Sequence, residues 1–134
     1  MTILEVYISG IQSLINEFKD KYNLNSGGDG MAAILVSEFL DRLGFYPTIT
    51  ACYKDDADIN ISFGSADHYM VVVAGLEINP PTWEPKRTKN ATYHECKEIM
   101  YNHDKEYNHI HDLEFLDKLY KISQYDTGTS QNDG

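Results

Sequence analysis

The sequence predicts an α+β fold, in which a small antiparallel sheet packs on a core helix with further helices at both ends of the chain. Three observations predict it: apolar residues recur at helical spacing before residue 44, runs rich in β-branched residues follow, and helical spacing returns from residue 92. A chain of 134 residues, 42% of them hydrophobic, can form one core but not two. We expect a single domain over residues 1–123 and a disordered polar tail over residues 124–134.

Two helices are expected in the first third of the chain. Thr2-Ile3-Leu4-Glu5 forms a capping box, in which the threonine hydroxyl and the glutamate carboxylate bind free amides of the first turn. A second helix is predicted from about Gly30 to Leu43, and Gly44 is suited to end it in the left-handed conformation. The side chains expected to face the core are Leu4, Tyr7, Ile11, Leu14, Ile15 and Phe18 from the first helix and Met31, Ile34, Leu35 and Phe39 from the second.

The middle of the chain carries the strand signals. Residues 46–53 alternate well enough for a strand, and residues 59–63 could form a short one. Residues 68–73 give the strongest signal, an apolar run rich in β-branched residues. Ala74-Gly75 forms a tight turn into residues 76–78, so these two strands are expected to form a hairpin.

The last third is expected to be irregular over Pro80–Pro85 and then helical. A helix is predicted from Thr92 onward, with Tyr93 and Cys96 on its inner side. Asp112 is placed to cap a final helix. The inward residues expected in that last helix are Leu113, Leu116, Leu119 and Tyr120.

The charge balance narrows the classes of partner. A net charge of −10 argues against binding to a nucleic-acid backbone, which needs clustered lysine and arginine, and it favours a protein partner with a basic surface. Two cysteines make a disulfide framework unlikely. The N-terminal segment contains acidic residues, unlike a signal peptide, and no apolar run could span a membrane. We expect a cytoplasmic protein, in a bacterial cell or in one infected by a phage.

Three segments in a particular order carry the strongest functional pattern. A Gly-Gly turn opens an apolar helix in Asn25-Ser26-Gly27-Gly28-Asp29-Gly30-Met31, a histidine begins the strand in Asp67-His68-Tyr69-Met70-Val71-Val72-Val73, and Gly75-Leu76-Glu77-Ile78-Asn79-Pro80 places an amide at the end of the next strand. Over roughly residues 25–82 this order resembles small papain-like or transglutaminase-like cysteine enzymes.

The resemblance implies a catalytic triad at Asp29, His68 and Asn79. In that family a cysteine at the start of a core helix is the nucleophile, because free amides and the helix dipole stabilise its thiolate. A histidine from a neighbouring strand accepts the proton, and an amide or carboxylate on the next strand orients the ring. Carried over by position, the nucleophile falls on Asp29, the base on His68 and the orienting group on Asn79, and Gly28 and Gly30 let the first helical turn face a cleft.

Aspartate at the nucleophile position changes the expected chemistry, because a carboxylate cannot act as a thiolate. As a helix N-cap, Asp29 would contribute about 1 kcal/mol of stability, which explains the residue without catalysis. It could also pair with a protonated His68. Two interpretations stay open: a natural pseudoenzyme, which we favour, or a replacement introduced at an active-site cysteine. Cys52 is a poor substitute nucleophile because it lies within a predicted strand.

Other candidate residues concern binding. Trp83, in the proline-rich segment after the triad strand, is the best single candidate for an interface or pocket anchor, and Tyr46, Tyr53 and Tyr69 could line a recognition surface. The histidines at 94, 103, 109 and 111, with Cys96, lack the i, i+4 spacing of a helical metal site. We therefore expect no metal site and no cofactor.

Three functions follow in order of preference. The first is a catalytically inactive papain-like domain that acts as an acidic binding or inhibitor protein, accessory to a phage or bacterial system. The second is a cysteine peptidase, amidase or acyltransferase whose nucleophile position is residue 29. The third is a structural subunit of an oligomer or particle, for which the native mass is the test.

Overall fold

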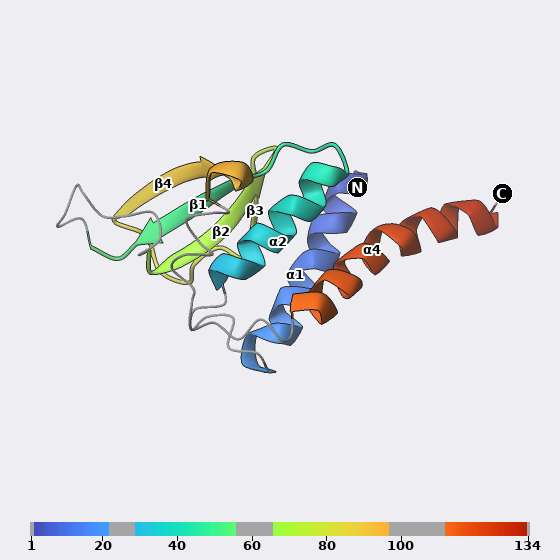
Figure 1. Ribbon diagram of the computed structural model, residues 1–134, viewed down its shortest axis with the longest axis horizontal. Helices are drawn as coiled ribbons and strands as arrows, with labels where there is room; N and C mark the ends of the chain where they lie inside the picture. Colours follow the sequence, from blue (N-terminus) through green and yellow to red (C-terminus); the bar gives the residue numbers. More distant parts are fainter. Residues whose placement is uncertain (1, 22–28, 56–65, 97–111, 134) are drawn as a thin grey trace.

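The computed structural model describes residues 2–21, 29–55, 66–96 and 112–133 and has the α+β architecture predicted (Figure 1). The expected strand at residues 59–63 and the continuation of the helix after Cys96 lie outside the described residues. The elements are α1 (Ile3–Lys21), α2 (Asp29–Arg42), β1 (Thr48–Tyr53), β2 (His68–Val73), β3 (Leu76–Ile78), β4 (Arg87–Thr92) and α4 (Asp112–Asp133). Residues 93–96 are also helical.

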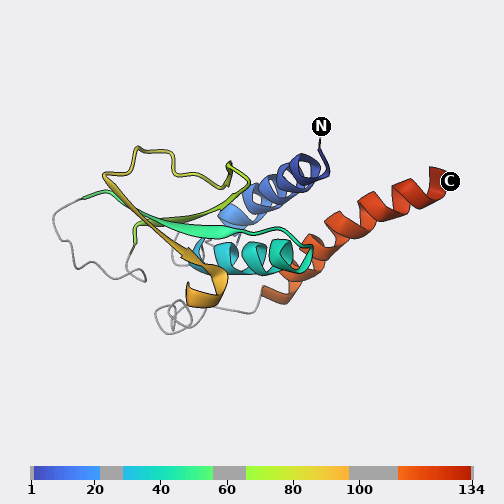
Figure 2. The same ribbon diagram turned by 90° about the horizontal axis from the view of Figure 1, so that it is seen from above.

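The four strands form one antiparallel sheet in the order β3-β2-β1-β4. Thr50 of the central strand β1 lies opposite Met70 of β2 and opposite Asn90 of β4. The Thr50 hydroxyl donates a hydrogen bond to Asn90 Oδ1 at 2.7 Å. Figure 2 shows that α2 runs along one face of this sheet. The predicted packing of a core helix on an antiparallel sheet is confirmed.

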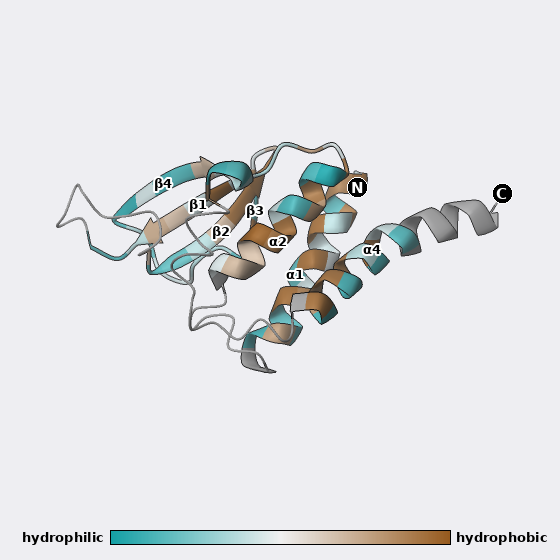
Figure 3. Ribbon diagram, viewed as in Figure 1, coloured by the Kyte–Doolittle hydropathy of each residue, from teal (hydrophilic) through white to brown (hydrophobic). Residues whose placement is uncertain are grey.

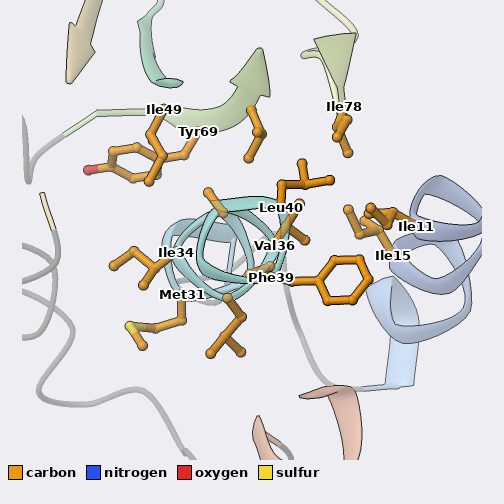
Figure 4. Close-up of a cluster of buried hydrophobic side chains, with 14 of the residues drawn as sticks. Ile11, Ile15, Met31, Ile34, Val36, Phe39, Leu40, Ile49, Tyr69 and Ile78 are labelled. Atoms are coloured by element: carbon orange, nitrogen blue, oxygen red, sulfur yellow. The ribbon is translucent and has the colours of Figure 1, made fainter. Parts of the chain in front are cut away.

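Helix α2 is the centre of the fold, because neighbours surround it on several sides. Ile49, Tyr69 and Ile78 reach it from the sheet, α1 flanks it, and α4 lies on the side opposite the sheet (Figure 4). A helix enclosed in this way is apolar over most of its surface, although Glu38, Asp41 and Arg42 near its C-terminal end are not buried. Its buried residues are Gly30, Met31, Ala32, Ala33, Ile34, Leu35, Val36, Ser37, Phe39 and Leu40.

Helix α1 matches its prediction closely. The backbone N–H of Glu5 donates to Thr2 Oγ1 at 3.1 Å, and the N–H of Thr2 donates to Glu5 Oε1 at 3.1 Å, so the capping box is formed. These bonds lower the pKa of Glu5, because they stabilise its carboxylate. The six side chains expected to face the core are all buried: Leu4, Tyr7, Ile11, Leu14, Ile15 and Phe18.

Strand β4 is the element that the sequence analysis missed. Its residues, Arg-Thr-Lys-Asn-Ala-Thr, contain no alternation of apolar and polar side chains, and most of them are exposed. In Figure 3 this edge of the sheet is largely hydrophilic. The strand is held by its ladder with β1 rather than by burial of its own side chains. Periodicity cannot detect such a strand.

Helix α4 differs from its prediction in two respects. Leu113, expected in the core, is 78% exposed, whereas Phe115 is buried and its ring meets that of Phe18 edge-on at 5.3 Å. The buried side follows Phe115 and Leu119 rather than Leu113. The backbone also stays helical to Asp133, where a disordered tail was expected from residue 124. Once a helix is nucleated, each further residue adds one hydrogen bond, so polar residues can extend it.

The hairpin between β2 and β3 is confirmed. Its turn places an alanine in an unfavourable backbone conformation, which can be tested by substitution. Its two turn residues, Ala74 and Gly75, have φ angles of 50° and 78°, the pattern of a type I′ turn. Alanine at positive φ is unfavourable, whereas asparagine tolerates it. We expect Ala74→Asn to raise the free energy of unfolding by about 1 kcal/mol, measured by urea denaturation. Ala74→Val should lower it, and equal stability of the three proteins would contradict the argument.

Candidate functional site

A cleft of about 190 Å³ lies at the end of the sheet where β1 ends, β2 begins and the chain leaves β3. Lys19, near the end of α1, also reaches it. The sequence pointed to His68 and Trp83 here, but it gave no local signal for the three charged residues that join them. The lining residues are Lys19, Lys54, Asp67, His68, Pro80, Pro81, Thr82 and Trp83.

His68 and Asn79 are brought together, through a main-chain contact. The Nε2 atom of His68 lies 2.7 Å from the backbone carbonyl oxygen of Asn79, and His68 is 9% exposed. A carbonyl oxygen can only accept, so Nε2 carries the proton and donates it to this bond. In the neutral ring, Nδ1 is then the nitrogen able to accept a proton. The resemblance implied an orienting side-chain amide, whereas here a backbone carbonyl orients the ring.

Asn79 is held in an unusual backbone conformation by α1. Its φ is 57°, a left-handed angle that asparagine tolerates better than most residues. Its backbone N–H donates to Gln12 Oε1 at 2.7 Å, which fastens the end of β3 to α1. The side-chain Oδ1 is buried and has no hydrogen-bond partner among the described residues. The main chain of Asn79 therefore connects α1 to the His68 ring.

Asp29 is the first residue of α2, close to the predicted start of that helix. Its side chain and residue Gly28 lie outside what the structure describes, and Gly30 is buried in the first turn. Ala32 and Ala33 line a small cavity of about 10 Å³ together with Tyr69, the residue after His68. The first turns of α2 and the start of β2 therefore lie at the same end of the molecule. No described residue of α2 lines the larger cleft.

Trp83 and Lys54 line the same cleft as His68 and contact each other. Lys54 Nζ lies 5.4 Å from the centre of the Trp83 ring, within the range of a cation–π contact. The backbone N–H of Lys54 donates to Asp67 Oδ2 at 2.8 Å. This bond ties the end of β1 to the start of β2. The cleft thus combines an aromatic face with ammonium and carboxylate groups.

The expected role of Tyr69 on a recognition surface needs correction. Tyr69 is 5% exposed and packs between the sheet and α2 (Figure 4), because strand alternation places it with Val71 and Val73. Its hydroxyl accepts the backbone N–H of Ala66 at 3.2 Å. Tyr53 is buried as well, and burial raises its pKa. Of the three tyrosines named, Tyr46 is the exposed one, at 90%.

Cys52 lies directly opposite His68 in the pairing of β1 with β2. Directly opposed residues on neighbouring strands project to the same face, so a thiol and an imidazole are neighbours there. The sequence placed Cys52 within a strand, and only the register of β1 with β2 reveals this pairing. Cys52 is 0% exposed, however, and does not line the cleft. A substrate cannot reach a sulfur buried in this way.

The structure describes only part of the histidine cluster, for which no metal site was expected, because residues 103, 109 and 111 lie outside the described residues. His94 is exposed, and its ring lies 4.0 Å from that of Tyr93. Cys96 donates its thiol hydrogen to the backbone carbonyl of Thr92 at 3.1 Å. The part of the chain that the structure describes contains no group of three or more possible metal ligands.

The two cysteines should be unreactive in the native protein. Burial raises the pKa of Cys96 to about 12, and Cys52 is inaccessible. We expect no reaction with a thiol reagent at pH 8 and two reactive thiols after unfolding. Because the folded pKa of Cys96 exceeds its unfolded value, its contribution to stability is present below about pH 9 and is lost as the pH rises toward 12.

The pH dependence can be assigned by comparing unfolding at pH 8 and pH 10.5 in the wild type and in Cys96→Ala. The variant should lose less stability across this interval. An equal loss in both proteins would show that Cys96 does not titrate as described.

Among the described helices, none is both long and apolar enough to cross a membrane. Comparisons with protein-family models, curated proteins and solved structures found no match for this chain.

Proposed function

We propose that this chain is a catalytically inactive domain of papain-like architecture that binds a protein partner through the cleft between His68 and Trp83. The observation that carries the proposal is the bond of 2.7 Å from His68 Nε2 to the Asn79 carbonyl at the edge of that cleft. The bond holds a histidine in a fixed orientation beside the partly exposed ring of Trp83. No thiol accompanies it at position 29.

The arrangement of elements supports the papain-like part of the proposal. In the family that the sequence resembles, the nucleophile begins a core helix, and the histidine and its orienting group lie on successive strands. Here α2 begins at Asp29, β2 begins at His68, and Asn79 directly follows β3, which pairs with β2. The order and the pairing agree with the resemblance, but the orienting group is a backbone carbonyl, and strand alternation turns His68 to the face of the sheet opposite Tyr69, which packs against α2.

Aspartate at position 29 is the reason to propose binding rather than catalysis. The start of a helix stabilises a carboxylate as readily as a thiolate, so Asp29 suits its position. A carboxylate there is a far weaker nucleophile toward an acyl group than a thiolate. The thiols within the described residues, Cys52 and Cys96, are both buried. The scaffold would thus retain its cleft and lose its acyl transfer.

The overall charge supports a basic partner. With a net charge of −10, the protein would attract a partner whose surface is positive, and complementary charge mainly raises the rate of association. Such a partner could be an enzyme that the domain inhibits by covering its active surface. A cytoplasmic setting, in a bacterial or phage-infected cell, is part of the same proposal.

The sharpest test of the scaffold restores the missing thiol. In Asp29→Cys, the rate of alkylation by iodoacetamide is measured against pH, with the wild-type protein as the background of buried cysteines. A thiol pKa well below the usual value of about 8.5, raised again in Asp29→Cys/His68→Ala, is the expected result. A slow, ordinary thiol in Asp29→Cys would overturn the papain-like assignment.

The binding role is tested with the full chain immobilised and a variant at the aromatic wall. A partner recovered by the wild type should be lost with Trp83→Ala and retained with Tyr46→Ala, since Tyr46 is an exposed aromatic residue outside the cleft. Unfolding curves must first show that both variants are folded. Recovery unchanged by Trp83→Ala would remove the cleft from the proposal.

The enzymatic alternative predicts a different outcome. If the unmodified chain hydrolyses an activated ester and His68→Ala abolishes that turnover, the domain is an enzyme that uses the cleft in another way. Turnover that His68→Ala leaves unchanged would come from a contaminating enzyme. The binding proposal expects no turnover by the wild type.

A further inference from the structure

We propose that the cleft recognises a carboxylate group attached to an apolar or aromatic body. This inference deepens the proposed function, on which it rests, by naming the chemical group that the partner would insert. It is carried by the lysines, the tryptophan and the dimensions of the cleft.

Two ammonium groups border the cleft from different elements. Lys19 reaches it from α1 and Lys54 from the end of β1. Within the described part of the chain, neither side chain forms an ion pair with a carboxylate. Two lysines and one aspartate leave the lining with a net positive charge, although the whole protein carries −10. An anion is therefore favoured here, against the sign of the overall charge.

The apolar surface around Trp83 favours a ligand that has an apolar part. Trp83 lines the cleft with a partly exposed ring, and Pro80 and Pro81 add apolar surface beside it. Because Lys54 Nζ lies 5.4 Å from the centre of the Trp83 ring, an anion bound by this lysine would be held next to the indole. A ligand that carries a carboxylate on a hydrocarbon body could contact both groups at once.

The size of the cleft restricts the ligand to one small group. A cavity of about 150 Å³ holds a benzene molecule, and this cleft measures about 190 Å³. Pockets for drug-sized ligands are larger, from about 300 Å³ upward. The cleft therefore suits one side chain with its terminal carboxylate, or a small free carboxylic acid, rather than a nucleotide.

The charge of the cleft favours a carboxylate over a phosphate. Asp67 lies in the lining, and the backbone N–H of Lys54 already engages one of its oxygens. A singly charged carboxylate balances the remaining positive charge. A doubly charged phosphate would leave an excess of negative charge beside Asp67, which is unfavourable.

Trp83 is the only tryptophan of the chain, so its fluorescence reports directly on the cleft. The probes are a blocked tripeptide ending in phenylalanine as the free acid, the same peptide as its amide, phenylacetate, and inorganic phosphate. We expect the free acid or phenylacetate to shift the emission with a saturable binding curve. The amide and phosphate should bind at least tenfold more weakly.

Matched lysine variants separate local contacts from overall charge. Lys19→Gln and Lys54→Gln should each weaken binding about two- to fivefold, the range for a partly exposed charge contact. Lys89→Gln removes the same charge from an exposed position on β4 outside the cleft and should leave the affinity unchanged. Equal effects of all three variants would overturn the inference, as would equal binding of acid and amide, or tighter binding of phosphate.

Comparing the peptide acid with phenylacetate distinguishes the two possible sources of the carboxylate. Tighter binding of the peptide acid than of phenylacetate would identify a carboxylate of a protein partner, and the reverse would identify a small free acid. If no probe binds while the Asp29→Cys thiol is activated by His68, the carboxylate inference fails and the scaffold proposal stands. If a probe binds while that thiol is ordinary, the papain-like proposal fails and the carboxylate site stands.

Discussion

Replacing Phe39 with alanine is expected to lower the free energy of unfolding by about 3–5 kcal/mol, the range for truncating a buried aromatic residue. Phe39 is 0% exposed, and its ring meets those of Tyr7 at 6.5 Å and Tyr120 at 5.5 Å, both nearly edge-on. These contacts join α2 to α1 and to α4. Because small domains are stable by about 5–15 kcal/mol, this single change could bring the protein close to unfolding.

Phe45→Ala is the matched control for Phe39→Ala. Phe45 meets the same Tyr7 ring at 6.5 Å, but it is only partly buried. Its loss should therefore cost clearly less, about 1–2 kcal/mol, in proportion to the smaller apolar area removed from contact. Urea unfolding of the three proteins measures the difference. Similar losses in both variants would show that the three helices do not share a single core at Phe39.

Gln12→Met is expected to cost about 1–3 kcal/mol, because it leaves the Asn79 backbone N–H without its acceptor. Asn79 is 4% exposed, and Gln12 Oε1 accepts its N–H at 2.7 Å. The same residue supplies the carbonyl that receives the His68 Nε2–H. The substitution should therefore loosen the histidine as well as lower the stability. The effect on the site would come from α1, which contributes no part of the predicted triad.

Gln12→Glu keeps an acceptor oxygen on a side chain of the same length, so it is the control for Gln12→Met. The readout is the His68 Nε2–H proton resonance, which a bond of 2.7 Å should protect from exchange with water. We expect it to persist in Gln12→Glu and to disappear in Gln12→Met at a temperature where both proteins are folded. Persistence in both variants would mean that α1 does not position the ring.

Much of the fold was predictable because its signals are local. The buried stripe of α1, the start of α2 close to the predicted Gly30 and the hairpin at Ala74-Gly75 each follow from a few neighbouring residues. The failures have a common cause. Strand β4 and the exposure of Leu113 depend on which neighbour an element meets, and no short window of sequence contains that information.

Three of the predicted site residues lie close together in the structure, and their functional role stays a prediction. His68, Asn79 and Trp83 were identified from the order of the motifs, and the structure brings His68 into contact with Asn79 and sets Trp83 on the same cleft as His68. The contact itself runs through a backbone carbonyl, which carries no sequence signal. The pairing of Asp29 with His68 stays a prediction, because the Asp29 side chain lies outside the described residues.

The sequence by itself determined which segments become helices and strands near the core, because the spacing of apolar side chains dictates which face each element must bury. It also determined that position 29 holds a carboxylate and not a thiol. Tertiary structure alone decided that Lys19 and Lys54 share a cleft with Trp83, and that Gln12 fixes Asn79. Polar residues far apart in the chain have no periodic relation to one another, so only the packing of the elements that carry them brings them together.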